Sequence, residues 1–124
     1  MIQNDSHIDL LDGLPLSETT FLILVSLDGE PKHGYAIMKE VQTLSQGRVT
    51  LSTGTLYGAI KRMLRDEWIR RVALPDEGKD ARQRKFYALT RRGRRILNAE
   101  TNRLRELVEI AGRQLAPGAQ SGGN

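Results

Sequence analysis

The spacing of apolar residues changes twice along this chain of 124 residues, and the changes limit the folds it can adopt. From residue 17 to residue 68 the apolar positions recur at the three- and four-residue intervals of helices. Between residues 69 and 90 they alternate, as in short strands. Beyond residue 90 the helical interval returns and continues to residue 115. The pattern predicts a mainly α fold with a two-stranded β-hairpin between the third and fourth helices.

The first two predicted helices differ in how much of their surface is apolar. Ser17 is the expected N-cap of the first, and the run Phe21–Val25 makes that helix apolar on nearly all sides, as in a central core helix. The second starts near His33, which we interpret as a helix-start residue rather than a ligand or base, and Gly47 stops it. Its expected buried face consists of Ile37, Val41 and Leu44.

The third predicted helix begins after Leu51, runs to about Trp68, and has two contrasting faces. Its apolar arc holds Leu56, Ala59, Ile60, Met63 and Leu64. Its opposite arc holds Gly54, Tyr57, Gly58, Lys61, Arg62 and Arg65. Two glycines one turn apart leave the backbone bare to a DNA strand, and the basic side chains can reach phosphates or guanine edges. Hydroxyl donors at the helix start are Ser52, Thr53 and Thr55.

A hairpin with a long basic tip is predicted after the third helix. Residues 69–74 are expected to form its first strand, residues 75–78 a turn or loop, and residues 85–90 the returning strand. The tip carries Lys79, Arg82 and Arg84. A basic loop tip can be merely solvated, or it can contact phosphates or the minor groove of DNA.

The last predicted helix runs from Thr90 or Arg91 to Leu115 and is about 37 Å long by the rise of an α-helix. An apolar seam follows it at heptad-like intervals and lacks one member, at Glu100 or Thr101. The seam consists of Leu97, Leu104, Val108, Ala111 and Leu115. It could pack within the monomer, but a helix this long overhangs so small a domain. We therefore expect a second copy of the chain to cover it.

A second apolar flank on the last helix exceeds what a two-helix seam requires. It consists of Ile96, Leu107 and Ile110. We therefore expect any ligand pocket to lie between the dimerising helices and the first helix. Its expected lining includes Ile96, Leu107 and Phe21.

Charge is distributed unevenly along the chain. Residues 48–95 hold 14 Lys and Arg against 5 Asp and Glu, a net charge of +9, whereas the other residues carry a net −5. A localised basic stretch is typical of proteins that bind polyanions, although it can also be a solvated face. Four of the arginines, at positions 91, 92, 94 and 95, begin the last helix. Positive charge there opposes the helix dipole, and a bound polyanion would compensate.

Several classes of protein are disfavoured. The longest apolar run has five residues, against the roughly 20 that a membrane span needs, so no membrane partner is expected. The chain has no cysteine and only two histidines, which are far apart, so we expect no metal site and no cofactor. No catalytic constellation is visible, so an enzyme is not expected. The lack of cysteine and of a basic-then-apolar leader favours a cytoplasmic location.

The order of the elements predicts a winged helix-turn-helix followed by a long C-terminal dimerisation helix. Helices two and three form the helix-turn-helix pair, the third reads the major groove, and the hairpin is the wing. We expect an N-terminal extension over residues 1–13, the DNA-binding domain over 14–90, the dimerisation helix over 91–116, and a disordered tail over 117–124.

Four sequence segments resemble the PadR family of transcriptional regulators. They are Leu14-Pro15-Leu16-Ser17, HGYAIMKEV, GTLYGAIKRML and KFYALTRRG, and they occur in the family's order and spacing over roughly residues 14 to 97. The resemblance implies a homodimeric winged-helix repressor that a small effector or another signal releases from DNA. The single terminal helix resembles the family's short subgroup, in which that helix dimerises.

Three departures from the family pattern stand out. Gly58 replaces a common proline, and Glu67 replaces a glycine that commonly ends the recognition helix, so the turn into the hairpin is expected to differ. Some drug-sensing members stack a flat ligand on a tryptophan of the dimerising helix. Here the only tryptophan, Trp68, precedes the first predicted strand, which argues against such a ligand.

The predicted function is sequence-specific binding of a palindromic double-stranded operator by a homodimeric repressor that responds to a small effector. The alternative is a winged-helix protein-interaction module with an incidental basic face, which a shallow salt dependence of DNA binding would indicate. The Tyr35 ring either packs in the core of the protein or contacts a phosphate of the DNA backbone. The predicted DNA-binding residues are Tyr35, Ser52, Thr53, Gly54, Thr55, Tyr57, Gly58, Lys61, Arg62, Arg65, Lys79, Arg82 and Arg84.

Overall fold

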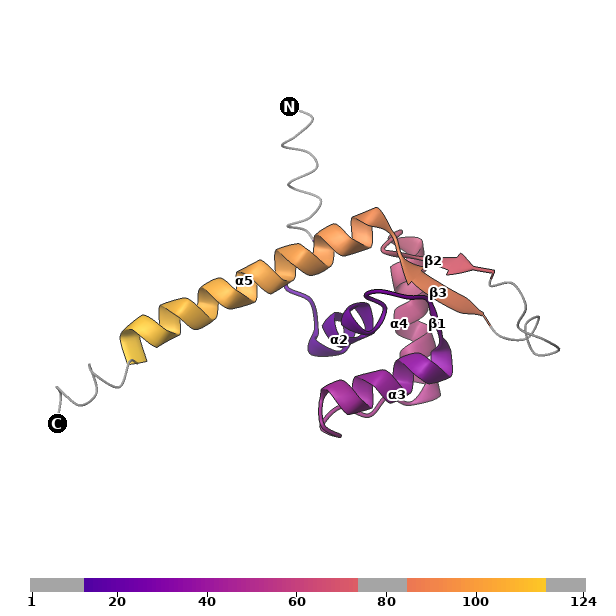
Figure 1. The fold of residues 1–124 in the computed structure, drawn as a ribbon, viewed down its shortest axis with the longest axis horizontal. Coiled ribbons are helices and arrows are strands. Elements are labelled where there is room, and N and C mark those ends of the chain that lie inside the picture. Colours follow the sequence, from indigo (N-terminus) through magenta and orange to yellow (C-terminus); the bar gives the residue numbers. More distant parts are fainter. Residues whose placement is uncertain (1–12, 74–84, 116–124) are drawn as a thin grey trace, which may run out of the picture.

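The computed structural model describes residues 13–73 and 85–115 and shows a small helical domain with one long projecting helix (Figure 1). The helices are α2 (Glu18–Ser26), α3 (Gly34–Leu44), α4 (Thr53–Arg65) and α5 (Arg91–Leu115). The strands are β1 (Lys32–His33), β2 (Ile69–Val72) and β3 (Phe86–Leu89). The predicted order of elements is confirmed, with the exception of β1. The predicted strand end at Leu74 and the predicted tail lie outside the described residues.

Side-chain caps fix where the helices begin. Ser17 caps α2 by accepting a hydrogen bond from the Thr20 amide at 3.1 Å. His33 caps α3 in the same way, since its Nδ1 accepts from the Ala36 amide at 3.3 Å, which confirms its interpretation as a helix-start residue. Thr90 caps α5 by accepting from the Gly93 amide at 2.9 Å.

The sheet is antiparallel and has three strands in the order β1-β3-β2, so the prediction of two strands was one short. Lys32 pairs with Tyr87 and His33 with Phe86, which places β3 in the middle of the sheet. Two residues are too few to show an alternating pattern, and they form a strand because the chain entering α3 runs along the free edge of β3. β2 and β3 form the predicted hairpin, from Ile69 opposite Leu89 to Val72 opposite Phe86.

The core lies where the inner faces of α2, α3, α4 and the start of α5 meet. Its fully buried apolar members include Ile23, Leu24, Ile37, Val41, Leu56, Ile60, Met63 and Ile96. The predicted apolar arc of α4 is confirmed, with Leu64 only partly buried. Leu44 was wrongly assigned to the buried face of α3, because it is the last helical residue and is 42% exposed.

Helix α4 ends three residues earlier than predicted, because Asp66 is its C-cap and Glu67 turns the chain toward β2. Glu67 has φ of 63°, a left-handed conformation that glycine adopts more readily. Glu67 therefore adopts the backbone conformation of the glycine that is common at this position in the family that the sequence resembles.

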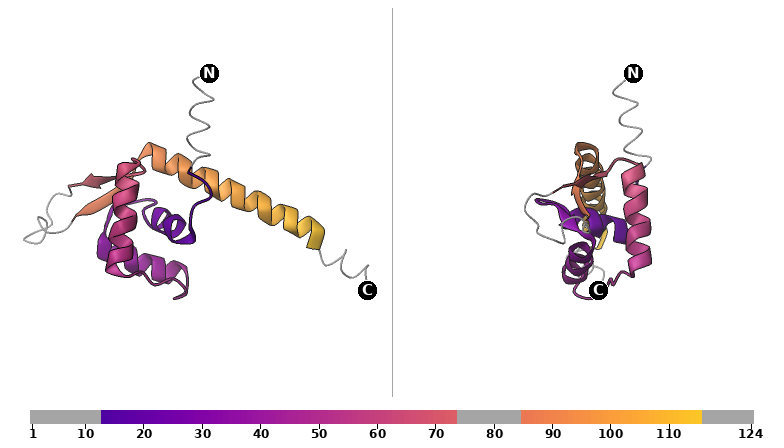
Figure 2. Two further views of the ribbon diagram at one scale, coloured as in Figure 1. Left: turned by 180° about the vertical axis from the view of Figure 1, so that it is seen from behind. Right: turned by 90° about the vertical axis from the view of Figure 1, so that its right-hand side faces the viewer.

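The two halves of α5 have different surroundings (Figure 2). In the first half, Ile96 and Leu97 are buried in the protomer, so neither belongs to the exposed seam or to a pocket wall as predicted. Gly93 lies directly against the carbonyl oxygen of Trp68, and a Cβ atom there would overlap that oxygen. The second half extends beyond α2 and exposes its apolar residues, which are Leu104, Leu107, Val108, Ile110 and Leu115.

A buried carboxylate explains why the apolar seam lacks a member at Glu100. This side chain is 1% exposed and accepts hydrogen bonds from the Leu16 amide at 3.1 Å and from Arg103 Nε at 2.6 Å. The hydrogen bond from Arg103 lowers the pKa of Glu100 and the Leu16 amide adds to this, while burial opposes both. Glu100 thus joins the chain entering α2 to the middle of α5.

No helix among the described residues is long and apolar enough to cross a membrane. Within the same residues, no group of three or more His, Asp or Glu side chains is placed to hold a metal ion.

Candidate nucleic-acid interface

The polar arc of α4 is solvent-exposed along its whole length. Ser52, Thr53, Gly54 and Thr55 are exposed at its start, and Lys61, Arg62 and Arg65 are exposed further along. Ser52 Oγ accepts from the Thr55 amide at 3.1 Å, so its hydroxyl also serves as the helix cap. The helix therefore presents hydroxyls at one end and cations toward the other, an arrangement suited to phosphates and base edges.

Tyr57 is held in place by the first residue of α3. Its ring lies over Gly34, where a Cβ atom would overlap the Tyr57 hydroxyl, yet 45% of its surface remains exposed. On the inner side, burial raises the pKa of Tyr87, and the neighbouring Tyr57 adds to this against the opposing effect of Arg71. Tyr57 thus connects the two helices of the helix-turn-helix and still faces solvent.

A second exposed aromatic side chain, Tyr35, lies at the start of α3. It is 64% exposed, which rules out the core-packing interpretation in the protomer, and its ring stacks on His33 with centroids 6.5 Å apart. Lys39 Nζ lies 5.6 Å from the centre of the Tyr35 ring. Sequence reasoning missed Lys39, although its spacing of four residues from Tyr35 puts both on one helix face.

The basic residues of α4 point in different directions. Lys61 follows Tyr57 by four residues and shares its face. Arg62 instead lines a small hollow with Ser17 and Asp66, toward the start of α2. Arg65 pairs with Asp66, with Nε 3.2 Å from Oδ1. Among the three, Lys61 has the most direct access to a ligand on the Tyr57 side.

The two glycines of α4 leave open space on this surface. No atom lies within 4 Å of a Cβ built at Gly54, and at Gly58 the nearest is Arg62 Nη1 at 3.8 Å. Packing within the protomer therefore does not require glycine at either position. The wing residues Lys79, Arg82 and Arg84 lie outside the described residues.

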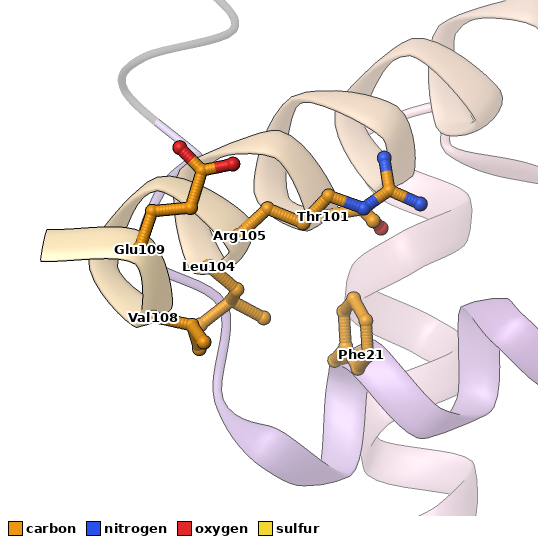
Figure 3. A pocket seen from close by; sticks show the side chains of 6 residues that line it. All are labelled: Phe21, Thr101, Leu104, Arg105, Val108 and Glu109. Atoms are coloured by element: carbon orange, nitrogen blue, oxygen red, sulfur yellow. The ribbon is translucent and has the colours of Figure 1, made fainter. Parts of the chain in front are cut away.

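An apolar hollow of about 360 Å³ lies between α2 and the projecting half of α5 (Figure 3). Phe21 forms one wall, and the opposite wall comes from α5. The α5 residues that line it are Thr101, Leu104, Arg105, Val108 and Glu109. The hollow lies between the first helix and the last one, and Leu104 and Val108 line it where Ile96 and Leu107 were predicted; its role as an effector pocket in a dimer stays a prediction.

Comparison of the sequence with known families gives a match over most of the folded region. The model of the transcriptional regulator PadR-like family matches residues 23–99. An uncharacterized 37.1 kDa protein in transposon TN4556 of Streptomyces fradiae is 35% identical over 91 residues, or 73% of this chain. The match covers 24% of that relative, so this chain spans about a quarter of its length.

Solved structures show the same fold. A PadR family transcription regulator from hypervirulent Clostridium difficile is 25% identical with a TM-score of 0.65, over 81% of this chain and 100% of that one. A PadR-like transcription factor from Bacteroides fragilis is 26% identical with a TM-score of 0.60, over 76% of this chain and 86% of that one. Since the family model covers more than half of the chain and the fold agrees, this protein belongs to the PadR-like family of transcriptional regulators.

Proposed function

We propose that this protein is a homodimeric repressor that binds a palindromic DNA operator through α4 and is released by a small effector. The observation that carries the DNA-binding proposal is the exposed face of α4, where Tyr57 and Lys61 lie along a helix whose backbone is open at Gly54 and Gly58. Of the basic residues in the stretch 48–95, Lys61, Arg62 and Arg65 belong to α4 itself, and their positive charge favours a polyanion as the ligand of that face.

The division of labour follows from what each element can contact. An α-helix fits the major groove, where base edges differ, so α4 carries sequence discrimination through Lys61 and Tyr57. Wing residues Arg82 and Arg84 hold phosphates, which are the same in every sequence. Tyr35 and Lys39, at the start of α3, add contacts to the DNA backbone.

The projecting half of α5 is the proposed dimer surface. It exposes Leu104 and Val108, which are 36% and 70% exposed, beside the hollow that contains Phe21. A second copy would bury these residues and close the hollow, which is where we place the effector. Two-fold symmetry of the dimer then requires a palindromic operator whose half-sites lie about one or two helical turns apart.

The test compares the helix and wing variants on two DNAs. An operator duplex is first defined by footprinting the DNA upstream of the protein's own gene. Lys61→Ala and Tyr57→Ala should weaken operator binding by about 1–3 kcal/mol and affect a scrambled duplex less. Arg82→Ala and Arg84→Ala should weaken both DNAs alike, and each should reduce the log–log salt slope by about one.

Two outcomes would contradict the proposal. Equal losses on both duplexes for all four variants would show that α4 does not read sequence. A shallow salt dependence with no preference for any duplex would favour a protein-interaction module instead.

A further inference from the structure

A second basic surface lies at the junction of α4, β2 and α5. An open hollow of about 630 Å³ is formed there by the end of α4, the first residues of β2 and the start of α5. Four arginines and one carboxylate line it, together with two apolar side chains and a threonine. These residues are Arg70, Arg91, Arg92, Arg95, Glu67, Leu64, Ile69 and Thr90.

Hydrogen bonds hold the walls of this hollow together. The Thr90 amide donates to the Trp68 carbonyl at 3.0 Å, and the Thr90 hydroxyl donates to the Glu67 carbonyl at 2.6 Å. Gly93 lies against the Trp68 carbonyl, so the start of α5 directly contacts the turn between α4 and β2. The backbones of β2 and of the start of α5, which carry these arginines, are therefore fixed relative to each other.

The charges around the hollow are unbalanced. Arg70, Arg91 and Arg95 are exposed, and no ion pair with an acidic side chain is found for them among residues 13–73 and 85–115. Nearby arginines do have such partners, since Arg94 lies 2.9 Å from Asp28 and Arg103 lies 2.6 Å from Glu100. The positive charges of Arg70, Arg91 and Arg95 repel one another. Because a guanidinium stays charged at every physiological pH, the repulsion is not relieved by loss of a proton, whereas a bound anion would relieve it.

Neither of the proposed binding surfaces accounts for this cluster. None of the arginines that line the hollow belongs to the polar arc of α4, whose hydroxyl-rich start lies at the opposite end of a 13-residue helix, about 20 Å away by helix rise. Of that arc only Arg65 lies at the hollow's end of the helix, and it pairs with Asp66. The exposed apolar residues of α5 begin at Leu104, beyond the buried first half of that helix. Figure 1 shows the start of α5 beside β2 and the end of α4.

We propose that this hollow binds a small organic or inorganic anion with two or more linked phosphate groups. Guanidinium groups bind phosphate oxygens through paired, charge-assisted hydrogen bonds, and the three exposed ones, of Arg70, Arg91 and Arg95, match the charge of a di- or triphosphate better than that of one phosphate. The volume lies within the range of ligand sites, about 300–1,000 Å³. Leu64 supplies an apolar patch that an organic group on the phosphates can cover.

The experiment uses the full chain and inorganic tripolyphosphate as the probe, with inorganic phosphate at matched ionic strength for comparison. Binding is measured by calorimetry and by the shift in melting temperature. Tripolyphosphate should bind about tenfold or more tightly than phosphate, and Arg91→Ala with Arg95→Ala should weaken it by a similar factor. Lys61→Ala with Arg62→Ala is the matched control, because it removes the same charge from the α4 face and should leave the affinity unchanged.

Measuring the operator affinity of the variants in the absence of tripolyphosphate distinguishes the proposal of an anion site from the proposal of DNA binding. The Arg91/Arg95 variant should keep wild-type operator affinity, and its melting temperature should be no lower than that of the wild type because the repulsion between arginines is reduced; this shows that it folds and that its loss is confined to the hollow. The proposal is overturned if tripolyphosphate binds no better than phosphate, or if the Lys61/Arg62 variant loses as much tripolyphosphate affinity as the Arg91/Arg95 variant. It is also overturned if the Arg91/Arg95 variant loses only operator affinity, since the arginines would then contact the DNA backbone.

Discussion

The hydroxyl of Tyr57 lies so close over Gly34 that a Cβ atom at residue 34 would overlap it. This contact joins the first residue of α3 to the exposed face of α4. The position of the aromatic ring that we expect to meet DNA therefore depends on the absence of a side chain in a different helix.

Gly34→Ala should displace the Tyr57 ring and weaken operator binding, with a stability cost of about 1–3 kcal/mol from overpacking. Gly34→Ala combined with Tyr57→Ala should lose little more operator affinity than Tyr57→Ala alone, because the displaced ring is already gone. Anisotropy titrations and urea unfolding of the three variants measure this coupling. Additive losses of affinity would show that Gly34 affects DNA binding without Tyr57.

Gly54→Ala should stabilise the protein and yet weaken its binding to DNA. Alanine favours a helix over glycine by up to about 1 kcal/mol, and open space surrounds the new methyl group in the protomer. The same methyl group would stand between α4 and a closely approaching DNA strand. Gly112→Ala in α5 is the matched control, because its Cβ also meets nothing, and it should stabilise without affecting DNA binding. Unchanged operator affinity for Gly54→Ala would exclude a close approach at this position.

Leu104→Glu with Val108→Glu should convert a wild-type dimer into monomers and abolish tight operator binding. Both side chains are exposed in the protomer, so the charges should not disturb its core but would be buried in a dimer. Light scattering at micromolar concentration measures the mass. Asn98→Glu with Asn102→Glu puts equal charge on the opposite side of α5 and should remain dimeric. If the wild-type protein has the mass of a single chain, the proposal of a dimer is wrong.

Glu100→Gln should destabilise the fold by about 1–3 kcal/mol at neutral pH, because a charge-assisted pair with Arg103 is lost. The pKa of Glu100 is lowered below its ordinary value of 4.5, so its contribution is complete above that value and is lost as the pH falls through the lowered one. Chemical unfolding at a series of pH values should therefore show a smaller acid loss of stability in the variant. Equal acid sensitivity in both proteins would show that other carboxylates dominate.

Local sequence patterns predicted the elements that depend on neighbouring residues. The caps Ser17, His33 and Thr90 and the buried arc of α4 follow from side chains within a few positions of one another. The exposure of Tyr57 and Lys61 follows from the same arc, because a helix that buries one side presents the other to solvent. The family resemblance was likewise carried by short segments and confirmed by the match over residues 23–99.

The sequence by itself determined which face of each helix is apolar, but not what would cover that face. Only the tertiary structure decided that Leu97 belongs to the protomer core while Leu104 stays exposed, because an open hollow separates Leu104 from Phe21 of α2. The burial of Glu100 depends on the Leu16 amide, 84 residues away along the chain. The pairing of β1 with β3 and the hollow that Arg70 and Arg91 both line likewise bring distant segments together. Periodicity records the side on which a residue lies, whereas its partner depends on how separate elements meet in space.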